Sequence, residues 1–279
     1  MEVQMGNKIH FFTKAFFCMI LFVFIISQST LPAYAEEAAG SKIEQIKKGG
    51  KLVVGTSADY PPYEFHLLNE QEGELVGIDI DIARVIAQEL GVKLEIKDII
   101  FSRLFDALEA GKIDIAIAGL HPTETRKKKA NFSDIYYQAI QAIVIRAENT
   151  DKIKTIEDLR GKIIGVQKDT IQEDMARSHI EGANFVVRET IEELIINLQK
   201  GLVDALILEK PVAESYVQRN KDFVIVTSKE FLDKMGSAIA VRKSDNDLLA
   251  EINRILKKMK VENKIDEFVE NAKVLTNKR

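Results

Sequence analysis

The sequence predicts an α/β protein built from two similar lobes, and three observations support this prediction. Short apolar segments of strand length alternate with longer segments in which apolar residues recur at helical spacing. The segment Gly50–Gly55 has a shorter counterpart at Gly161–Gly165. A clearer repeat joins Leu108–Asp114 to Leu198–Asp204, since each combines a helix end, a glycine, an aspartate and the start of an apolar run. Two motifs that recur in the same order indicate two units of similar build.

The first predicted elements alternate as a parallel sheet covered by helices requires. A short helix at Ile43–Lys48 precedes a strand at Lys51–Gly55. The loop Thr56–Phe65, rich in proline and aromatic residues, then leads towards a helix at Ile78–Leu90, where the apolar residues have helical spacing. A second strand follows at Val92–Ile96.

A strand, turn and helix in the first half predict the first binding feature. Ile113–Ala118 is a mostly apolar strand, and Thr123 is a suitable N-cap, so Arg126 falls in the first turn of the next helix. An anion held there would gain the free backbone N–H groups, the helix dipole and a guanidinium fork. The alternative is an exposed arginine on a solvated face that continues through Lys127–Lys129.

The second half leaves the first lobe and returns to it. The apolar extended runs Tyr136–Ile145 and Ala238–Val241 are predicted to be the two hinge strands. Ser244–Met259 is an amphipathic helix expected to pack on the first lobe, and Ile265–Val274 is expected to be a further helix. The predicted lobes are residues 41–140 with 238–279 and residues 141–237.

Residues 1–35 are predicted to be a cleavable signal peptide. Lys8 and Lys14 form a positive start, Ala15–Ile26 is an apolar run too short to span a membrane comfortably, and Ala33–Ala35 fits a cleavage site with small residues. We therefore predict export to the periplasmic or extracellular side, with the mature protein either soluble or tethered. Cys18 is the only cysteine and lies in this segment, so we expect no thiol or disulfide chemistry in the mature chain.

Composition and motifs argue against several function classes. A net charge of −4 at pH 7 argues against nucleic acid as a partner. The histidines His66, His121 and His179 form no pair at helical metal-binding spacing, and neither a phosphate-binding glycine loop nor a serine nucleophile elbow is present. We therefore expect no metal, no cofactor and no catalytic activity.

Groups suited to a small zwitterion lie at predicted strand ends in both halves, where α/β sheets place their ligands. Asp169 and Thr170 open a helix whose free N–H groups could face a carboxylate. Glu209 ends a strand and could pair with an ammonium group, while Tyr60 and Phe101 follow first-lobe strands and could stack on a ligand side chain. Each residue also has an ordinary alternative role as a cap, a surface pair or a core side chain.

Five stretches resemble the extracellular solute-binding proteins of ABC transporters for polar amino acids, the family of the glutamine, histidine and lysine/arginine/ornithine binders. They are GTSADYPPYEF, VGIDIDIARVIAQELG, AGLHPTETRKKKANFSDIYY, GVQKDTIQEDMA and VDALILEKPVAE, and the resemblance runs from about Lys51 to Lys264. It implies a fold of the type II periplasmic-binding-protein kind, with two α/β lobes joined by two hinge strands. It also implies a monomer that closes on an amino acid and delivers it to a membrane permease.

The resemblance implies a role for each candidate residue. Arg126 would bind the ligand α-carboxylate, helped by backbone groups at Gly119, His121 and Thr170. Glu209 would take the place of the acid, usually aspartate, that binds the α-ammonium group. The aromatic walls would be Tyr60 and Phe101.

Departures from the family pattern leave the ligand open between the basic amino acids and glutamine. Ser57 stands where basic-amino-acid binders usually have aspartate, and Gln167 stands where the glutamine binder has lysine. Asp59 and Glu64 should make the local field negative, which disfavours acidic ligands and places arginine or lysine ahead of glutamine. Two other functions are open to this fold: a cyclohexadienyl dehydratase-like enzyme, and a sensor module, which would need membrane spans or a signalling domain.

Overall fold

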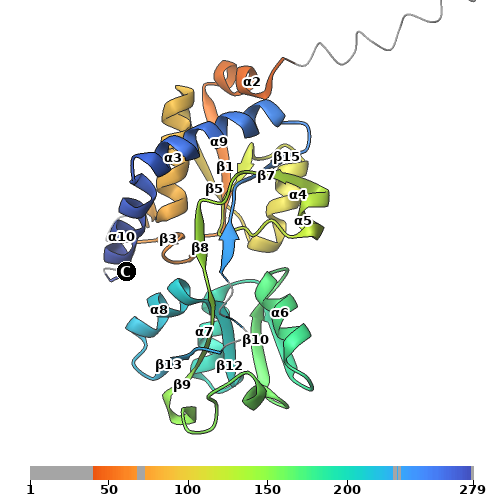
Figure 1. Ribbon diagram of the computed structural model, residues 1–279, viewed down its shortest axis with the longest axis vertical. Coiled ribbons are helices and arrows are strands. Elements are labelled where there is room, and N and C mark those ends of the chain that lie inside the picture. Colours follow the sequence, from red (N-terminus) through yellow and green to blue (C-terminus); the bar gives the residue numbers. More distant parts are fainter. Residues whose placement is uncertain (1–39, 68–72, 229–230, 232–233, 278–279) are drawn as a thin grey trace, which may run out of the picture. The chain divides into compact units, whose positions relative to one another are not determined.

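The computed structural model describes residues 40–67, 73–228, 231 and 234–277. The predicted signal peptide lies outside the described residues. From Lys42 onward the chain forms one compact unit that contains two five-stranded sheets (Figure 1). Within the described part of the chain, no helix has the length and apolar character needed to cross a membrane.

The sheet of the first lobe has the strand order β5-β1-β6-β15-β7. Strand β1 (Lys51–Thr56) pairs in parallel with β5 (Lys93–Asp98) and with β6 (Ile115–Ala116). Strand β15 (Ala240–Arg242) is antiparallel to both β6 and β7 (Ala130–Phe132). The sheet is therefore mixed rather than parallel throughout, because β15 re-enters from the second lobe and runs opposite to β6.

Helices cover both faces of this sheet (Figure 1). The predicted helix Ile78–Leu90 is observed as α3, and it shares one apolar cluster with α2 (Lys42–Gly49), α9 (Asn246–Val261) and α10 (Lys264–Thr276). Helix α4 (Leu104–Glu109) packs with a separate cluster on the opposite face. The prediction of an amphipathic helix over Ser244–Met259 that packs on the first lobe is confirmed, and so is a further helix over Ile265–Val274.

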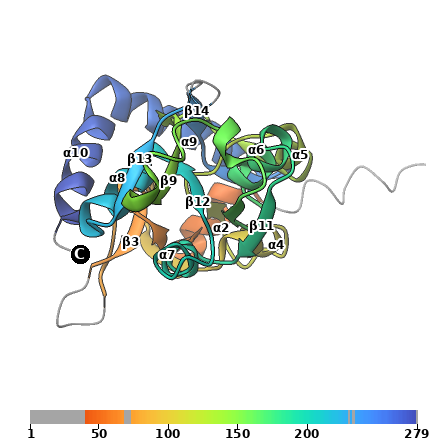
Figure 2. The same ribbon diagram turned by 90° about the horizontal axis from the view of Figure 1, so that it is seen from below.

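The sheet of the second lobe has the strand order β11-β10-β12-β9-β13, with β9 antiparallel to its neighbours β12 and β13. Helix α6 packs on one face, and α7 and α8 pack on the other (Figure 2). The helices are α6 (Ile171–His179), α7 (Ile191–Gln199) and α8 (Lys210–Arg219). The strands are β9 (Gln141–Arg146), β10 (Ile163–Gln167), β11 (Asn184–Arg188), β12 (Ala205–Glu209) and β13 (Phe223–Val226).

Two short antiparallel strands, β8 (Tyr137–Ala139) and β14 (Met235–Ser237), run between the two sheets (Figure 1). The first lies within the predicted hinge run. The second hinge strand was predicted too far along the chain, because Ala240 and Val241 belong to β15 of the first-lobe sheet. A fully apolar run marks burial in a sheet, whereas the crossing strand contains a glycine and a serine and so carries a weaker strand signal.

The predicted loop Thr56–Phe65 contains a small sheet. Strand β2 (Asp59–Tyr60) pairs with β3 (Glu64–His66), so that Tyr60 lies opposite Glu64, and β3 pairs in turn with β4 (Leu75–Val76). Two consecutive prolines occupy the turn. Because proline is rare within strands and common in turns, strand propensity alone predicted a loop here. This hairpin fixes several acidic and aromatic side chains at the edge of the first lobe.

The repeated motif is a structural device shared by both lobes. Asp114 Oδ2 accepts the backbone N–H of Val53 at 2.8 Å, and Asp204 Oδ2 accepts that of Ile163 at 2.9 Å. In both lobes the aspartate lies where the chain passes from a helix to a strand. Its side chain forms a hydrogen bond with the backbone of the neighbouring parallel strand.

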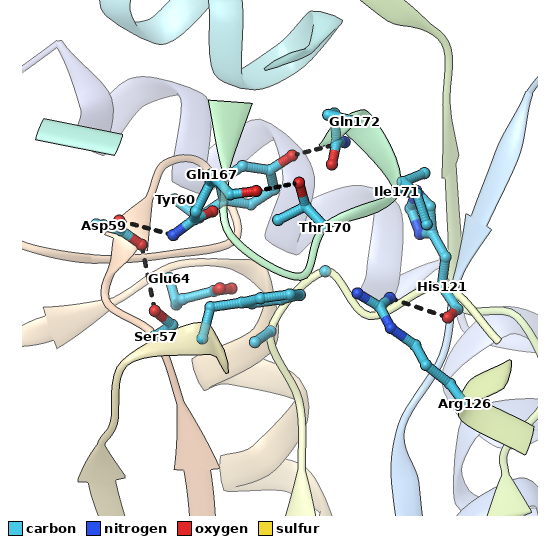
Figure 3. A pocket seen from close by; sticks show the side chains of 13 residues that line it. Ser57, Asp59, Tyr60, Glu64, His121, Arg126, Gln167, Thr170, Ile171 and Gln172 are labelled. Atoms are coloured by element: carbon cyan, nitrogen blue, oxygen red, sulfur yellow. Dashed lines mark hydrogen bonds between the residues drawn. The ribbon is translucent and has the colours of Figure 1, made fainter. Parts of the chain in front are cut away.

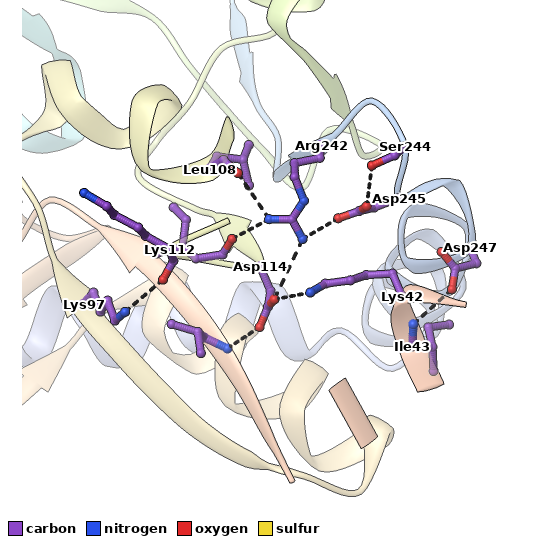
Figure 4. Close-up of polar contacts among 12 residues, drawn as sticks. Lys42, Ile43, Lys97, Leu108, Lys112, Asp114, Arg242, Ser244, Asp245 and Asp247 are labelled. Carbon is purple, nitrogen blue, oxygen red and sulfur yellow. Dashed lines mark hydrogen bonds and ion pairs between the residues drawn. The ribbon is translucent and has the colours of Figure 1, made fainter. Parts of the chain in front are cut away.

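An arginine completes the device in each lobe. Arg242 Nη1 donates to the carbonyl oxygens of Leu108 at 3.2 Å and Ile113 at 2.7 Å (Figure 4). Arg146 Nη1 donates to the two equivalent carbonyl oxygens of the second lobe at 2.8 and 2.7 Å. The prediction of two lobes of similar build is thus confirmed at the level of individual hydrogen bonds.

Candidate ligand-binding site

A cavity lies where strands of both sheets end. Eight of the nine predicted site residues line it, and Glu209 does not. The eight are Ser57, Tyr60, Phe101, Gly119, His121, Arg126, Gln167 and Thr170. The remaining lining residues, which were not predicted as ligand contacts, are Asp59, Glu64, Ala118, Ile171 and Gln172 (Figure 3).

Arg126 is a buried cation on the wall of this cavity. Thr123 caps helix α5 (Glu124–Lys129) by accepting the Arg126 N–H, which confirms the predicted helix start. The guanidinium donates to the carbonyl oxygens of His121 at 3.1 Å and of Asp169, in the second lobe, at 2.9 Å. It also lies 5.2 Å from the centre of the Phe101 ring.

The charge of Arg126 has no ion-pair partner in the described part of the chain, although only 9% of the residue is exposed. Burial lowers the pKa of its guanidinium to about 10, so the group is still charged at neutral pH. The alternative of an exposed arginine on a solvated face is therefore wrong. A buried, unpaired guanidinium favours an anionic group of a ligand at this position.

Glu209 ends β12 as predicted and lies behind the cavity wall. It is fully buried, accepts a hydrogen bond from the Tyr63 hydroxyl, and has Oε1 2.8 Å from His121 Nε2. The alternative of a surface pair with Lys210 is wrong, since Lys210 lies 3.8 Å from Glu214 instead. The acid thus reaches the cavity through its neighbour His121, which lines it.

Gly119 contributes shape rather than a free donor. Its N–H donates to Asp79 Oδ2 at 2.9 Å, so the expectation that this group would help to bind a ligand carboxylate is wrong. Gly119 has φ +54°, and a Cβ there would lie 3.2 Å from the Tyr60 ring. The glycine therefore permits the close approach of Tyr60, whose ring stacks on Tyr63 with centroids 5.4 Å apart.

Glu64 forms another part of the cavity wall (Figure 3), and the Asp79 carboxyl group lies behind it. Glu64 is fully buried, and among the described residues no N–H or O–H group donates to either of its carboxylate oxygens. Burial and the neighbouring Asp79 carboxyl raise the pKa of Glu64 well above its ordinary value. Burial also raises the pKa of Asp79 to about 6, although hydrogen bonds from Gly119 and Tyr136 oppose this shift. A donor-rich cation would satisfy these oxygens.

The second-lobe side of the cavity is formed by the connection from β10 to α6. Thr170 accepts the N–H of Glu173 at 3.2 Å as the α6 cap and donates to the Gln167 carbonyl oxygen at 2.7 Å. The Gln167 amide donates to Asp59 Oδ2 at 3.2 Å rather than pointing into the free space, and Ser57 donates to Asp59 Oδ1 at 3.3 Å (Figure 3). Two residues predicted to select the ligand are therefore engaged with Asp59.

A family comparison decides the identity of the chain. The family model of the bacterial extracellular solute-binding proteins, family 3, matches residues 52–272. The chain belongs to this family. The fold is accordingly that of the type II periplasmic-binding-protein kind, and the two hinge strands join the two α/β lobes.

Individual relatives agree with the family assignment. The arginine-binding extracellular protein ArtP of Bacillus subtilis is 37% identical over 233 residues, which cover 81% of this chain and 88% of ArtP. A crystal structure of the amino acid ABC transporter substrate-binding protein AbpA from Streptococcus pneumoniae, bound to L-arginine, superposes with a TM-score of 0.81 at 33% identity. That match covers 84% of this chain and 98% of the AbpA chain.

A third similar structure relates to the enzyme alternative. The ancestral amino acid-binding protein AncCDT-1, a precursor of cyclohexadienyl dehydratase, is 35% identical with a TM-score of 0.76, and the match covers 83% of this chain and 99% of that one. It too is described as a binding protein. The protein is a transport binding protein and not an enzyme. In the described residues no group of three or more His, Cys, Asp or Glu side chains could hold a metal ion.

Proposed function

We propose that this protein binds L-arginine between its two lobes and delivers it to the membrane permease of an ABC importer. The observation that carries the ligand assignment is Glu64, a fully buried carboxyl group that lines the cavity and to whose oxygens no N–H or O–H group of the described residues donates. Ionising this carboxyl group beside Asp79 is costly without a positive partner, so the cavity favours a ligand that brings hydrogen-bond donors and positive charge to it.

The charges of the cavity match the three charges of arginine. Arg126 receives the α-carboxylate, with the N-terminus of α6 at Thr170 facing it from the second lobe. Glu209, together with His121, provides the negative charge for the α-ammonium group. Glu64, which has the Asp79 carboxyl group beside it, receives the guanidinium, whose planar arrangement of five N–H donors suits a carboxyl group better than the compact ammonium of lysine.

The aromatic residues provide the apolar part of the site. Tyr60 is buried and stacked on Tyr63, and Phe101 begins the 3₁₀ turn that follows β5. Flat rings at these positions suit the methylene chain and the planar guanidinium of arginine. The relatives support the same ligand, since ArtP is named for arginine binding and AbpA was crystallised with L-arginine.

The remaining parts of the function follow from the family. We propose lobes at residues 41–140 with 238–279 and at 141–237, and a signal peptide at residues 1–35 that directs export. The ligand bridges the lobes, so it stabilises the closed form through contacts that the open form lacks, and the permease recognises that closed form. The protein acts as a monomer.

A thermal-shift panel of the twenty amino acids tests the proposal. A ligand at a hundred times its dissociation constant stabilises the folded state by about 2.7 kcal/mol, so L-arginine should give the largest shift and lysine a smaller one. Glutamic and aspartic acid should give none. A shift confined to acidic or leucine-like amino acids, or a larger shift with glutamine than with arginine, would overturn the ligand assignment.

A further inference from the structure

We propose that Asp59 fastens the two lobes directly to each other, so that part of the unliganded protein is closed and Asp59 strengthens the binding of every ligand by the same factor. Asp59 is then a positioning residue that acts through closure. The inference rests on the proposed function only for the choice of ligand, because closure without ligand can be measured separately.

Three hydrogen bonds join Asp59, in the first lobe, to residues of the second lobe. Asp59 Oδ2 accepts the backbone N–H of Ile191, at the start of α7, at 2.6 Å and the Gln167 amide, at the end of β10, at 3.2 Å. The Asp59 carbonyl oxygen accepts the Tyr216 hydroxyl, from α8, at 2.9 Å. Three separate elements of the second lobe therefore meet at one position of β2.

The first lobe orients the residue for this role. Ser57 donates to Asp59 Oδ1 at 3.3 Å, and Ala58 is held in turn by Asp98 Oδ1 through its N–H at 3.0 Å. Asp59 is only 8% exposed in the closed arrangement. Since Ile191 N belongs to the first turn of α7, it has no partner within that helix, and a carboxylate satisfies it with a charge-assisted bond.

Other bonds between the lobes differ in kind. Ser102 donates to Glu189 Oε2 at 2.7 Å, but the Glu189 side chain is 41% exposed and also pairs with Lys168. Solvent competes for such a bond, so its contribution is small. The bond from Arg126 to Asp169 belongs to the carboxylate socket. Glu209 also has buried partners in the opposite lobe, Tyr63 and His121, but these contacts belong to the proposed ammonium site. Asp59 has three partners in the opposite lobe, and they come from three separate elements.

The hydrogen bonds of Asp59 with Ile191, Gln167 and Tyr216, together called the latch below, have a specific thermodynamic consequence. The apparent dissociation constant equals the intrinsic one divided by the fraction of protein in the binding-competent state. Removing the latch lowers the closed fraction of the protein. The affinities for arginine and for lysine then fall by the same factor. A residue that selects between the ligand side chains would instead change the ratio of the two affinities.

Single-molecule energy transfer measures closure without ligand. Dyes can be placed on cysteines introduced at the exposed positions Glu109 and Glu181, one in each lobe, because the sequence after residue 35 contains no cysteine. The unliganded protein should show a closed population, and Asp59→Ala should remove most of it. Tyr216→Phe, which deletes a bond from the opposite lobe and leaves Asp59 intact, should reduce that population in the same direction.

Calorimetry on the same proteins completes the test. Asp59→Ala should weaken arginine and lysine alike, by about tenfold, whereas the matched control Ser102→Ala should change neither the closed population nor the affinities. The latch is refuted if the unliganded protein shows no closed population, if Asp59→Ala and Tyr216→Phe leave it unchanged, or if the two ligands lose affinity by different factors. Failure of arginine to bind, with the closed population intact, would refute the proposed function and not the latch.

Discussion

His121 Nε2 lies 2.8 Å from Glu209 Oε1, and the two side chains are 4% and 1% exposed. The other Glu209 oxygen accepts a hydrogen bond from Tyr63. The acid at the end of β12 is thus held by two side chains of the first lobe, and the histidine lies between the acid and the cavity. Neither feature could be read from the position of Glu209 at a strand end.

Replacing Glu209 by glutamine should weaken arginine binding by at least about tenfold, or about 1.4 kcal/mol, because the ammonium group loses its charge partner. Titration calorimetry measures this effect. Glu214→Gln is the matched control, since that glutamate is exposed and pairs only loosely with Lys210 at 3.8 Å. Equal affinities for the two variants would remove Glu209 from the ammonium site.

Arg126→Lys should also weaken binding by at least about tenfold, because a point charge replaces a planar fork that can hold a carboxylate with two bonds. The change should affect arginine and lysine similarly, since both ligands carry the same α-carboxylate. Arg103→Lys, at an exposed position where the arginine pairs with Asp106, is the control. An unchanged dissociation constant for Arg126→Lys would show that the carboxylate binds elsewhere.

The raised pKa of Glu64 predicts that arginine binding releases a proton. Burial and Asp79, followed by smaller contributions from Asp59 and Glu209, favour the protonated Glu64 carboxyl in the empty cavity. A guanidinium beside it favours the ionised form and lowers the pKa in the complex. Affinity should therefore rise with pH across the interval between the two pKa values, by up to a factor of ten per pH unit.

Citrulline provides the reference for this pH effect, because it has the shape of arginine without the side-chain charge. Burial raises the pKa of Asp59 to about 7, with Glu192 adding to the shift, and closure acts on that group whichever ligand is bound. The ratio of the arginine and citrulline affinities reports on Glu64 and should increase as the pH rises above the ordinary pKa of a glutamate side chain. A constant ratio would contradict the protonated state of the empty site.

The repeated aspartates predict a stability effect that leaves binding intact. Asp204→Ala should lower the free energy of unfolding by about 1–3 kcal/mol, because the Ile163 N–H loses its acceptor. Asp114→Ala should cost more, since Asp114 also lies 2.5 Å from Lys42 Nζ (Figure 4). Urea unfolding measures both, and arginine affinity should be unchanged. A loss of affinity with no loss of stability would assign these residues to the site instead.

The fold could be predicted largely from sequence because its signals are local. Helical spacing gave the bounds of α3 without error, and Thr123 marked the start of α5. The hinge strand Met235–Ser237 was not predicted, because its residues have little strand preference and its position is set by pairing with β8. Pairing partners far along the chain leave no local pattern.

The site was predicted in part for the same reason. Strand ends marked Arg126 and Gln167, but the roles of Asp59 and Glu64 depend on what the hairpin and the opposite lobe place against them. A sequence shows that these two acids share a loop. It does not show that Asp59 is hydrogen-bonded to the second lobe or that Glu64 lacks a donor among the described residues. This difference is the reason that Asp59 is proposed to hold the lobes together and Glu64 to bind the ligand.

The most direct test of the central claim compares arginine with citrulline in calorimetric titrations of the unmodified protein and of Glu64→Gln. The unmodified protein should bind arginine at least about tenfold more tightly than citrulline, and Glu64→Gln should remove most of this preference by weakening the binding of arginine alone. Equal binding of the two ligands by the unmodified protein, or a preference that survives Glu64→Gln unchanged, would contradict the claim.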